Sequence, residues 1–308
     1  MKNKRILNAL GQVDEKYIEE ATPIKRGGKN RGWVRWGSIA VCLFLIIGGA
    51  FAWRYYDDTP IKPNQGITLS EDGVTIPPLN VTLSDNVEAD MIGFFIYQER
   101  CYVQYEWIYG EVDFIDEYLG TATGLIDEWT SKDGYVELAG SVGGDFYSVK
   151  GFDPSFMLCM EHEDGSVSTY INNNGLTLKT GADLFDTRLH LAGNYNTVQY
   201  QSYSEWFNSS GDPIAIDRGY EETVSSFVHS LNAAQFMPTD DITLNEDEDL
   251  YDKEIWHLYF LMNNGMTIHL RLYEGGYVRF QGMMDICVKV EDDAFNAMTN
   301  IFSSGDFD

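Results

Sequence analysis

Cysteine is scarce in this sequence, with 4 in 308 residues, and no two are spaced as Cys-x-x-Cys. Cys42 lies within an apolar run, so Cys101, Cys159 and Cys287 are left, an odd number that excludes a complete disulfide framework. Two arrangements stay open, namely three partly buried thiols or one disulfide with a spare thiol. The 5 histidines are scattered along the chain, so the sequence predicts no metal site and no cofactor.

Recognisable catalytic motifs are also missing. The sequence contains no Gly-x-Ser-x-Gly elbow, phosphate-binding loop, dinucleotide fingerprint or His-Glu-x-x-His helix. The acidic run 245–249 lacks the glycine and the terminal glutamate of a calcium loop, so we interpret it as a solvated loop. We therefore expect no enzyme and assign no catalytic residue, and an exported enzyme remains only a third alternative.

Positive charge is nearly absent from most of the chain. Residues 1–35 contain 9 Lys or Arg and 4 Asp or Glu, whereas residues 54–308 contain 12 and 44. An acidic region of this kind repels phosphate backbones, which argues against direct binding of nucleic acid. The two charge regimes indicate two different environments.

A run without any charged residue separates these two regimes. Residues 36–53 would span about 27 Å as a helix, close to the thickness of a bilayer core. Basic residues cluster on the N-terminal flank, where we expect them to face anionic membrane lipid: Lys25, Arg26, Lys29, Arg31 and Arg35. The sequence thus predicts a single-pass protein of the cell membrane, with its N-terminus in the cytoplasm and its C-terminal region outside.

Two alternatives to a membrane span fit the sequence less well. A signal peptide cleaved at Ala50-Phe51-Ala52 would need a basic region of 35 residues, which is unusually long. A lipoprotein anchor at Cys42 is disfavoured because Val41 stands where a small residue is required. We therefore predict a transmembrane helix.

The first 22 residues have the period of an amphipathic helix. The apolar stripe consists of Ile6, Leu10, Val13, Tyr17 and Ala21. Pro23 ends the pattern, and a basic glycine-rich linker follows. With no second cytoplasmic element predicted, the stripe has three options: to lie on the membrane, to remain partly folded, or to dock into a groove of a partner.

The fold class predicted for the whole chain is α+β. We expect a cytoplasmic segment (1–35), a transmembrane helix (36–53), a stalk (54–66), a β-rich exported region (67–212) and an exported α+β unit (213–308). The last unit should contain helices at 220–234 and 292–303, with strands at 255–262, 266–273 and 277–281 between them. Turns at 163–165 and 263–265 should close two hairpins.

The segment Ile6-Leu-Asn-Ala-Leu-Gly-Gln-Val-Asp-Glu-Lys-Tyr-Ile-Glu-Glu-Ala21, followed by a basic linker and one span, resembles the cytoplasmic end of anti-sigma-factor-like membrane proteins of clostridial type. Stretches 120–124, 145–151 and 275–278 are similar to exported parts of such proteins. The resemblance implies a Gram-positive bacterium and a partner, an extracytoplasmic-function sigma factor. The His-x-x-x-Cys-x-x-Cys zinc pattern of many anti-sigma domains is absent, so the sigma contact would rest on the amphipathic helix alone.

Two functions are consistent with this layout. In the first, the stripe of residues 6–21 sequesters a sigma factor, and the exported region senses an envelope signal that triggers its release. In the second, the exported region binds a component of the envelope, and the N-terminus serves only as a topogenic anchor.

Overall fold

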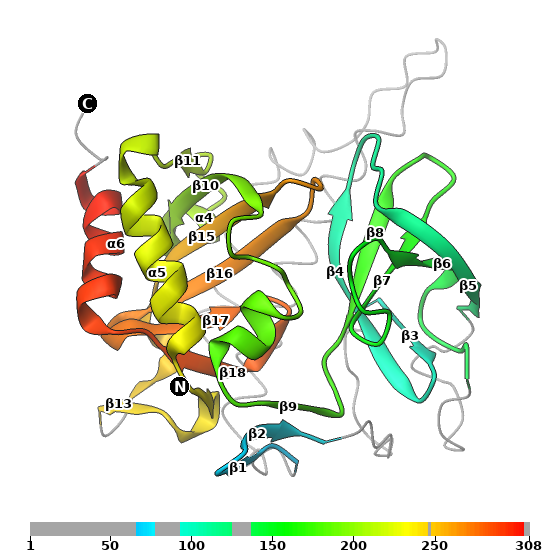
Figure 1. The fold of residues 1–308 in the computed structure, drawn as a ribbon, viewed down its shortest axis with the longest axis horizontal. Coiled ribbons are helices and arrows are strands. Elements are labelled where there is room, and N and C mark those ends of the chain that lie inside the picture. Colours follow the sequence, from blue (N-terminus) through cyan, green and yellow to red (C-terminus); the bar gives the residue numbers. More distant parts are fainter. Residues whose placement is uncertain (1–65, 78–92, 125–136, 246–247, 305–308) are drawn as a thin grey trace, which may run out of the picture. The chain divides into compact units, whose positions relative to one another are not determined.

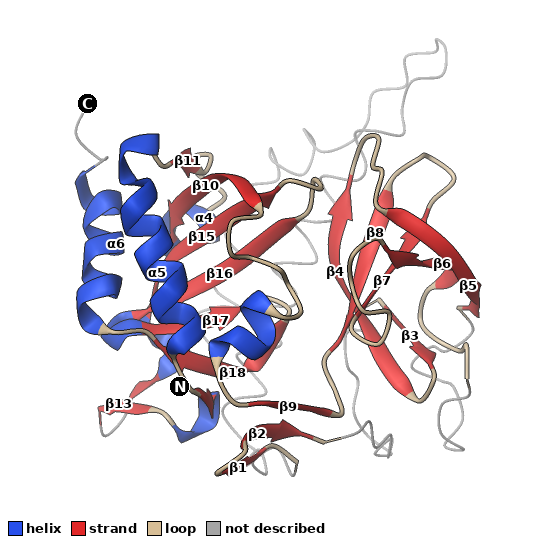
Figure 2. Ribbon diagram, viewed as in Figure 1, coloured by secondary structure: helices blue, strands red, loops and turns tan. Residues whose placement is uncertain are grey.

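The computed structural model describes residues 66–77, 93–124, 137–245 and 248–304. They belong to one unit, residues 61–308, which is strand-rich and of the α+β class (Figures 1 and 2). The predicted segments 1–35 and 36–53, and all but the last residue of the predicted stalk (54–66), lie outside the described residues. Among the described residues, no helix is both long and apolar enough to cross a bilayer.

A seven-stranded sheet occupies the C-terminal half of this unit. Its spatial order is β11 (Ile214–Ala215), β10 (Tyr195–Ser202), β15 (Glu254–Met262), β16 (Thr267–Tyr273), β17 (Tyr277–Phe280), β18 (Met283–Lys289) and β12 (Phe236–Pro238). All of its strand pairs are antiparallel. Because β10 pairs with β15 along its whole length, this sheet draws strands from both sides of residue 212.

Two helices lie side by side on one face of this sheet, α5 (Glu221–Ala233) and α6 (Asp292–Ser304) (Figure 1). Both begin with two acidic residues, which favour a helix N-terminus. Their buried residues recur at helical spacing: Val224, Phe227, Val228 and Leu231 in α5, and Phe295, Met298, Ile301 and Phe302 in α6. The two predicted helices are confirmed, as are the predicted strands that became β15, β16 and β17.

A six-stranded sheet precedes the seven-stranded sheet in the chain. Its order is β3 (Phe94–Tyr97), β4 (Arg100–Ile108), β8 (Val167–Asn172), β7 (Met157–Glu161), β6 (Gly143–Val149) and β5 (Ile115–Thr123). Residues 138–142 contact both outer strands, through the bonds Leu138 N–H to Ile96 O and Thr123 N–H to Leu138 O. The sheet therefore curls toward closure around its own core, whose buried residues are Phe95, Tyr102, Ala122, Phe146, Leu158, Met160 and Tyr170.

Smaller elements complete the unit. A three-stranded sheet joins β1 (Thr68–Ser70) and β2 (Gly73–Ile76) to β9 (Leu176–Leu178), and a π-helix follows at Ala182–Asp186. The acidic run 245–249, predicted as a loop, instead contains the end of β13 (Thr243–Asn245) and the strand β14 (Glu248–Asp249), and a 3-10 helix follows at Leu250–Lys253. Short strands with an acidic sequence give no apolar alternation, which explains why this prediction was wrong.

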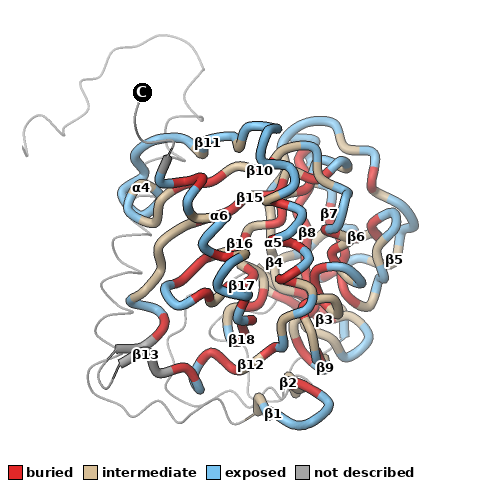
Figure 3. Tube along the Cα trace, turned by 60° about the vertical axis from the view of Figure 1, so that its left-hand side comes forward, coloured by how far each residue is buried: buried red, intermediate tan, exposed pale blue. Residues whose placement is uncertain are grey.

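The largest hydrophobic core continues through both main sheets. It includes Phe156 and Ile171 of the first half together with Phe227, Leu270 and Phe302 of the second. Buried residues therefore run along the strands of both sheets, whereas the segment that holds α4 (Tyr203–Phe207) and β11 is exposed (Figure 3).

Candidate functional site

All ten residues predicted as sites lie outside the described residues. The apolar stripe (Ile6, Leu10, Val13, Tyr17 and Ala21) and the basic flank (Lys25, Arg26, Lys29, Arg31 and Arg35) both precede residue 66. Two other features of the described residues attract attention, a buried group of polar side chains and an open pocket.

The buried polar group lies on the central strands of the seven-stranded sheet. On β15 and β16, Leu258, Phe260 and Leu270 are fully or almost fully buried in the large core. Polar side chains occupy alternate positions at His257, Tyr259, His269 and Arg271. A register shift between Glu254 and Trp256 brings Glu254 to the same face. We call Glu254, His257, His269 and Arg271 the imidazole cluster.

Short contacts connect the members of the imidazole cluster. Nδ1 of His257 and Nε2 of His269 are 2.9 Å apart, a distance at which one nitrogen donates and the other accepts. Nε2 of His257 lies 2.7 Å from a carboxylate oxygen of Glu254, and the other oxygen of Glu254 accepts a bond of 3.2 Å from Arg271. The side chains of His257 and Glu254 are 0% and 5% exposed, so this contact is shielded from solvent.

The contact between Glu254 and His257 is close but poorly directed. Neither Oε1 of Glu254 nor Nε2 of His257 has a hydrogen-bond partner of good geometry, although the two atoms are only 2.7 Å apart. We read the contact as an ion-dipole or ion-pair contact rather than as a linear hydrogen bond, because distance dominates the Coulomb interaction. The carboxylate still favours a hydrogen on the facing nitrogen of His257.

Aromatic rings cover the imidazole cluster. The rings of Trp206 and His257 have centroids 4.5 Å apart, and the Arg271 guanidinium lies 4.8 Å from the centre of the Trp206 ring. Tyr259 stacks on His269 at 4.5 Å, and its hydroxyl donates to Gln201 at 3.2 Å. These contacts connect β15 and β16 to β10 and α4.

Burial strongly changes the protonation of the cluster. Desolvation, followed by the neighbouring His257 and Arg271, lowers the pKa of His269 to about 2. Desolvation likewise raises the pKa of Tyr259 to about 12. In the folded protein His269 is therefore neutral across the physiological range, as is Tyr259.

A junction between the two main sheets lies beside the cluster. The first residues of β16 extend past the end of β17. On that side the His269 carbonyl accepts from Gln281 N–H at 3.0 Å, whereas His269 N–H and the backbone groups of Thr267 are bound by side chains of β4. The Tyr105 hydroxyl donates to Thr267 O at 2.8 Å and accepts from His269 N–H at 3.0 Å, and a Glu106 carboxylate oxygen accepts from Thr267 N–H at 3.0 Å. Burial raises the pKa of both Tyr105 and Glu106. Side chains of β4 thus complete the hydrogen bonding of β16.

A β-bulge makes this junction possible. The pairing of β4 with β8 shifts between Gln104 and Glu106, which leaves Tyr105 as the extra residue. Strict alternation would send Tyr105 and Glu106 to opposite faces. The structure instead directs both side chains to β16.

A second buried cation lies on the same sheet. Arg279 is 0% exposed, and its two terminal nitrogens donate to the hydroxyls of Tyr273 and Tyr251 at 3.2 and 3.3 Å. The guanidinium also lies 4.4 Å from the centre of the Tyr251 ring. No ion pair of Arg279 is found among the described residues, where phenol oxygens and ring faces surround the charge.

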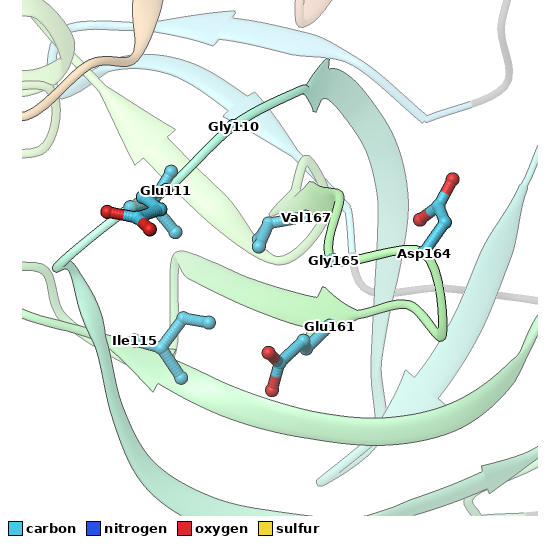
Figure 4. Close-up of a pocket in the computed structure, with 8 residues that line it drawn as sticks. Gly110, Glu111, Ile115, Glu161, Asp164, Gly165 and Val167 are labelled. Carbon is cyan, nitrogen blue, oxygen red and sulfur yellow. The ribbon is translucent and has the colours of Figure 1, made fainter.

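Figure 4 shows an open pocket of about 550 Å³ on the six-stranded sheet. It lies between the segment after β4 and the turn of the β7–β8 hairpin. The lining residues are Gly110, Glu111, Val112, Ile115, Glu161, Asp164, Gly165 and Val167. Apolar side chains and three carboxylates therefore meet in it, without a basic residue.

Exposed aromatic rings accompany the pocket residues in the sequence. Trp107, which is 39% exposed, stacks on His162 with ring centroids 4.1 Å apart, and Tyr109 is 79% exposed. The turn at 163–165 forms as predicted, with Gly165 at a φ of 79° that favours glycine. Hydrogen bonds from Ser166 hold the pKa of Asp164 below its usual range.

The chemistry available at the cluster is limited. A carboxylate that orients an imidazole is half of a catalytic triad, but a nucleophile must also lie within reach of the imidazole. The described cysteines are free thiols elsewhere, and His269 has too low a pKa to act as a base near neutral pH. No group of three or more possible metal ligands occurs among the described residues.

Comparison with known proteins gives no further guide. No protein-family model, curated protein or solved structure matches this chain. Function must therefore be argued from the residues themselves.

Sequence reasoning missed the imidazole cluster because it treated the histidines as scattered. A usable signal was present in the β15–β16 hairpin. The turn at 263–265 places Tyr259 opposite His269 and His257 opposite Arg271, so the two histidines become diagonal neighbours. Polar residues that alternate with apolar ones on two central strands were the sign of a polar group on that face of the sheet.

Proposed function

We propose that this protein is a membrane-anchored regulator, which sequesters a sigma factor through its N-terminal helix and senses an envelope signal through residues 67–308. One observation carries the proposal. An 18-residue uncharged run divides a basic segment with a usable apolar stripe from an acidic region of 255 residues. A transmembrane regulator needs this layout, with a partner-binding element on one side and a folded sensor on the other.

Supporting evidence comes from the size and construction of the C-terminal region. It has a large core and enough buried surface to be a stable domain, and it carries both a pocket and a buried polar cluster. A topogenic anchor alone would not need the apolar stripe of residues 6–21. The stripe is therefore the element to test.

The test compares two variants of the full-length chain in membranes. Leu10→Asp places a charge on the stripe, whereas Gln12→Asp places the same charge off the stripe. We expect Leu10→Asp to weaken the retention of the partner sigma factor at least about tenfold, because a buried apolar contact is worth roughly 2 kcal/mol, and Gln12→Asp to leave retention unchanged. Equal retention by the two variants would overturn the proposal.

A second function is favoured by the pocket of Figure 4. Carboxylates, apolar side chains and exposed aromatic rings suit an envelope component with cationic and apolar parts. In that case the protein is an envelope-binding protein, and the N-terminus is only an anchor. Deletion of residues 1–22 should then preserve its function, as long as the basic flank 25–35 remains.

A further inference from the structure

The segment of residues 203–216 lies over the imidazole cluster and has few ties to the rest of the fold. It contains α4 and β11, and none of its residues is buried. Phe207 is 67% exposed and Ile214 is 42% exposed. Two residue pairs connect β11 to β10, and a capping box of Ser202 and Glu205 begins α4. We call residues 203–216 the cover segment.

Four contacts fasten the cover segment to the polar residues beneath it. The Trp206 ring packs against His257 at a tilt of 34° and receives the Arg271 guanidinium on its face. The side chain of Gln201 donates to Gly211 O at 2.9 Å while its oxygen accepts from Tyr259. Tyr203 adds a weaker ring contact with His257 at 6.3 Å. The stability of the cover segment therefore depends on the state of the cluster.

The charges around the two histidines come from every neighbouring element. Glu254 lies on β15 and Arg271 on β16, and together they cancel when both histidines are neutral. Glu106 of β4 lies on the far side of Tyr105, and Asp252 acts on Tyr203 from the 3-10 helix at 250–253. The phenols of Tyr203 and Tyr259 stay neutral because burial raises their pKa.

The cluster can accept one proton but not two. The 2.9 Å gap between His257 and His269 holds a single hydrogen, and Glu254 can compensate a charge on His257. A second proton would point two N–H groups at each other and leave an excess positive charge beside Arg271. Both histidines can become charged only if the pair separates and water reaches His257. Trp206 of the exposed helix α4 covers His257.

We propose that the Glu254–His257–His269 chain and Trp206 form a pH-sensitive latch, which holds residues 203–216 closed at neutral pH and releases them when the surrounding medium is acidified. Release uncovers the imidazoles and frees the exposed Phe207 and Ile214 for other contacts. The latch belongs to the described unit alone. It goes beyond the proposed function and stands whether or not a sigma factor is the partner.

Hydrogen exchange of the full-length chain, followed by mass spectrometry, tests the latch. Rates at pH 7.5 and 5.0 are divided by the intrinsic rates at each pH. Opening returns one histidine to its ordinary unfolded pKa, so that it takes up a proton in acid. Amides within residues 203–216 should therefore open about thirtyfold more often at pH 5.0 than at pH 7.5. Amides of α5, which lies on the other face of the sheet, should remain far more protected than those of residues 203–216 at both pH values, because they open only when the whole unit unfolds.

Matched variants separate the latch from general acid loosening. His269→Gln keeps a donor in place of Nε2 but cannot titrate, so it should abolish the acceleration. His229→Gln removes an exposed histidine on α5 and should leave the acceleration intact. If His269→Gln does not fold, the unmodified protein still decides the matter: no acceleration of residues 203–216, or opening of α5 as frequent as that of residues 203–216 at pH 5.0, overturns the proposal.

Discussion

Replacement of Tyr105 by phenylalanine tests whether β4 side chains complete the hydrogen bonding of β16. The change removes one oxygen and keeps the ring, which packs 5.1 Å from the Phe280 ring. It leaves Thr267 O and His269 N–H without the partner at 2.8 and 3.0 Å. A lost partner for a buried polar group costs about 1–3 kcal/mol.

The junction is only partly buried, so water can rescue some of this loss. We therefore expect Tyr105→Phe to lower the free energy of unfolding by roughly 2 kcal/mol, which is near the lower limit for the loss of two hydrogen-bond partners. Urea unfolding of the full-length chain in detergent, followed by far-ultraviolet circular dichroism, measures the change. The m-value should stay constant, because the surface exposed on unfolding is the same.

Tyr118→Phe is the matched control. Tyr118 is 58% exposed on β5, and its hydroxyl bonds to the nearby Thr121. Its loss should change stability by less than about 0.5 kcal/mol. The reasoning fails if the two variants lose the same amount, or if Tyr105→Phe is as stable as the unmodified protein. Coupling with Glu106→Gln in a double-mutant cycle would then show whether the two side chains act together.

Three further predictions concern other parts of the unit. The folded pKa of His269, about 2, lies below its unfolded value, so its contribution to stability is complete above about pH 6.5 and is lost as the pH falls. Urea unfolding should therefore show that the free energy of unfolding falls by about 2 kcal/mol from pH 7.5 to 5.0. The same loss in His269→Gln would contradict this. Gly181→Ala should lower the free energy of unfolding by about 2 kcal/mol or more, as measured by thermal unfolding, because the added Cβ would lie 1.9 Å from Leu231 O. An unchanged stability would show that the backbone moves aside at low cost. Cys159 and Cys287, whose pKa values burial raises to about 12, should resist a thiol reagent at pH 8 until urea is added, and rapid labelling of the folded protein would refute the assigned burial.

The local elements of this fold were largely predictable from the sequence. The helices at 221–233 and 292–304 follow from apolar residues at helical spacing, and the turns at 163–165 and 263–265 follow from glycine in the required position. β18 was missed because Ile286, Cys287 and Val288 are all buried, so the alternation that reveals a strand is absent there.

The pairing of distant strands was not predictable. Alternation in β10 shows which residues face the core, but nothing in it selects β15 as the neighbour. The bulge at Tyr105 has no glycine or proline to mark it. The imidazole cluster depends on these choices, since Gln201, Trp206 and Tyr105 reach it from elements that a local pattern cannot place.

The junction between β4 and β16 also has a consequence for biosynthesis. Tyr105 and Glu106 meet Thr267, a residue that follows them by more than 160 positions. At about 5–20 residues per second, a ribosome needs roughly 8–30 seconds to make the intervening chain. The strands of the first sheet are complete once residue 172 has been made, yet the outward-facing phenol and carboxylate of its bulge have no backbone to bind until residue 267 follows. The first half of the domain must therefore wait for the second before it reaches its final form, and a nascent chain arrested before residue 267 should be a substrate for chaperones.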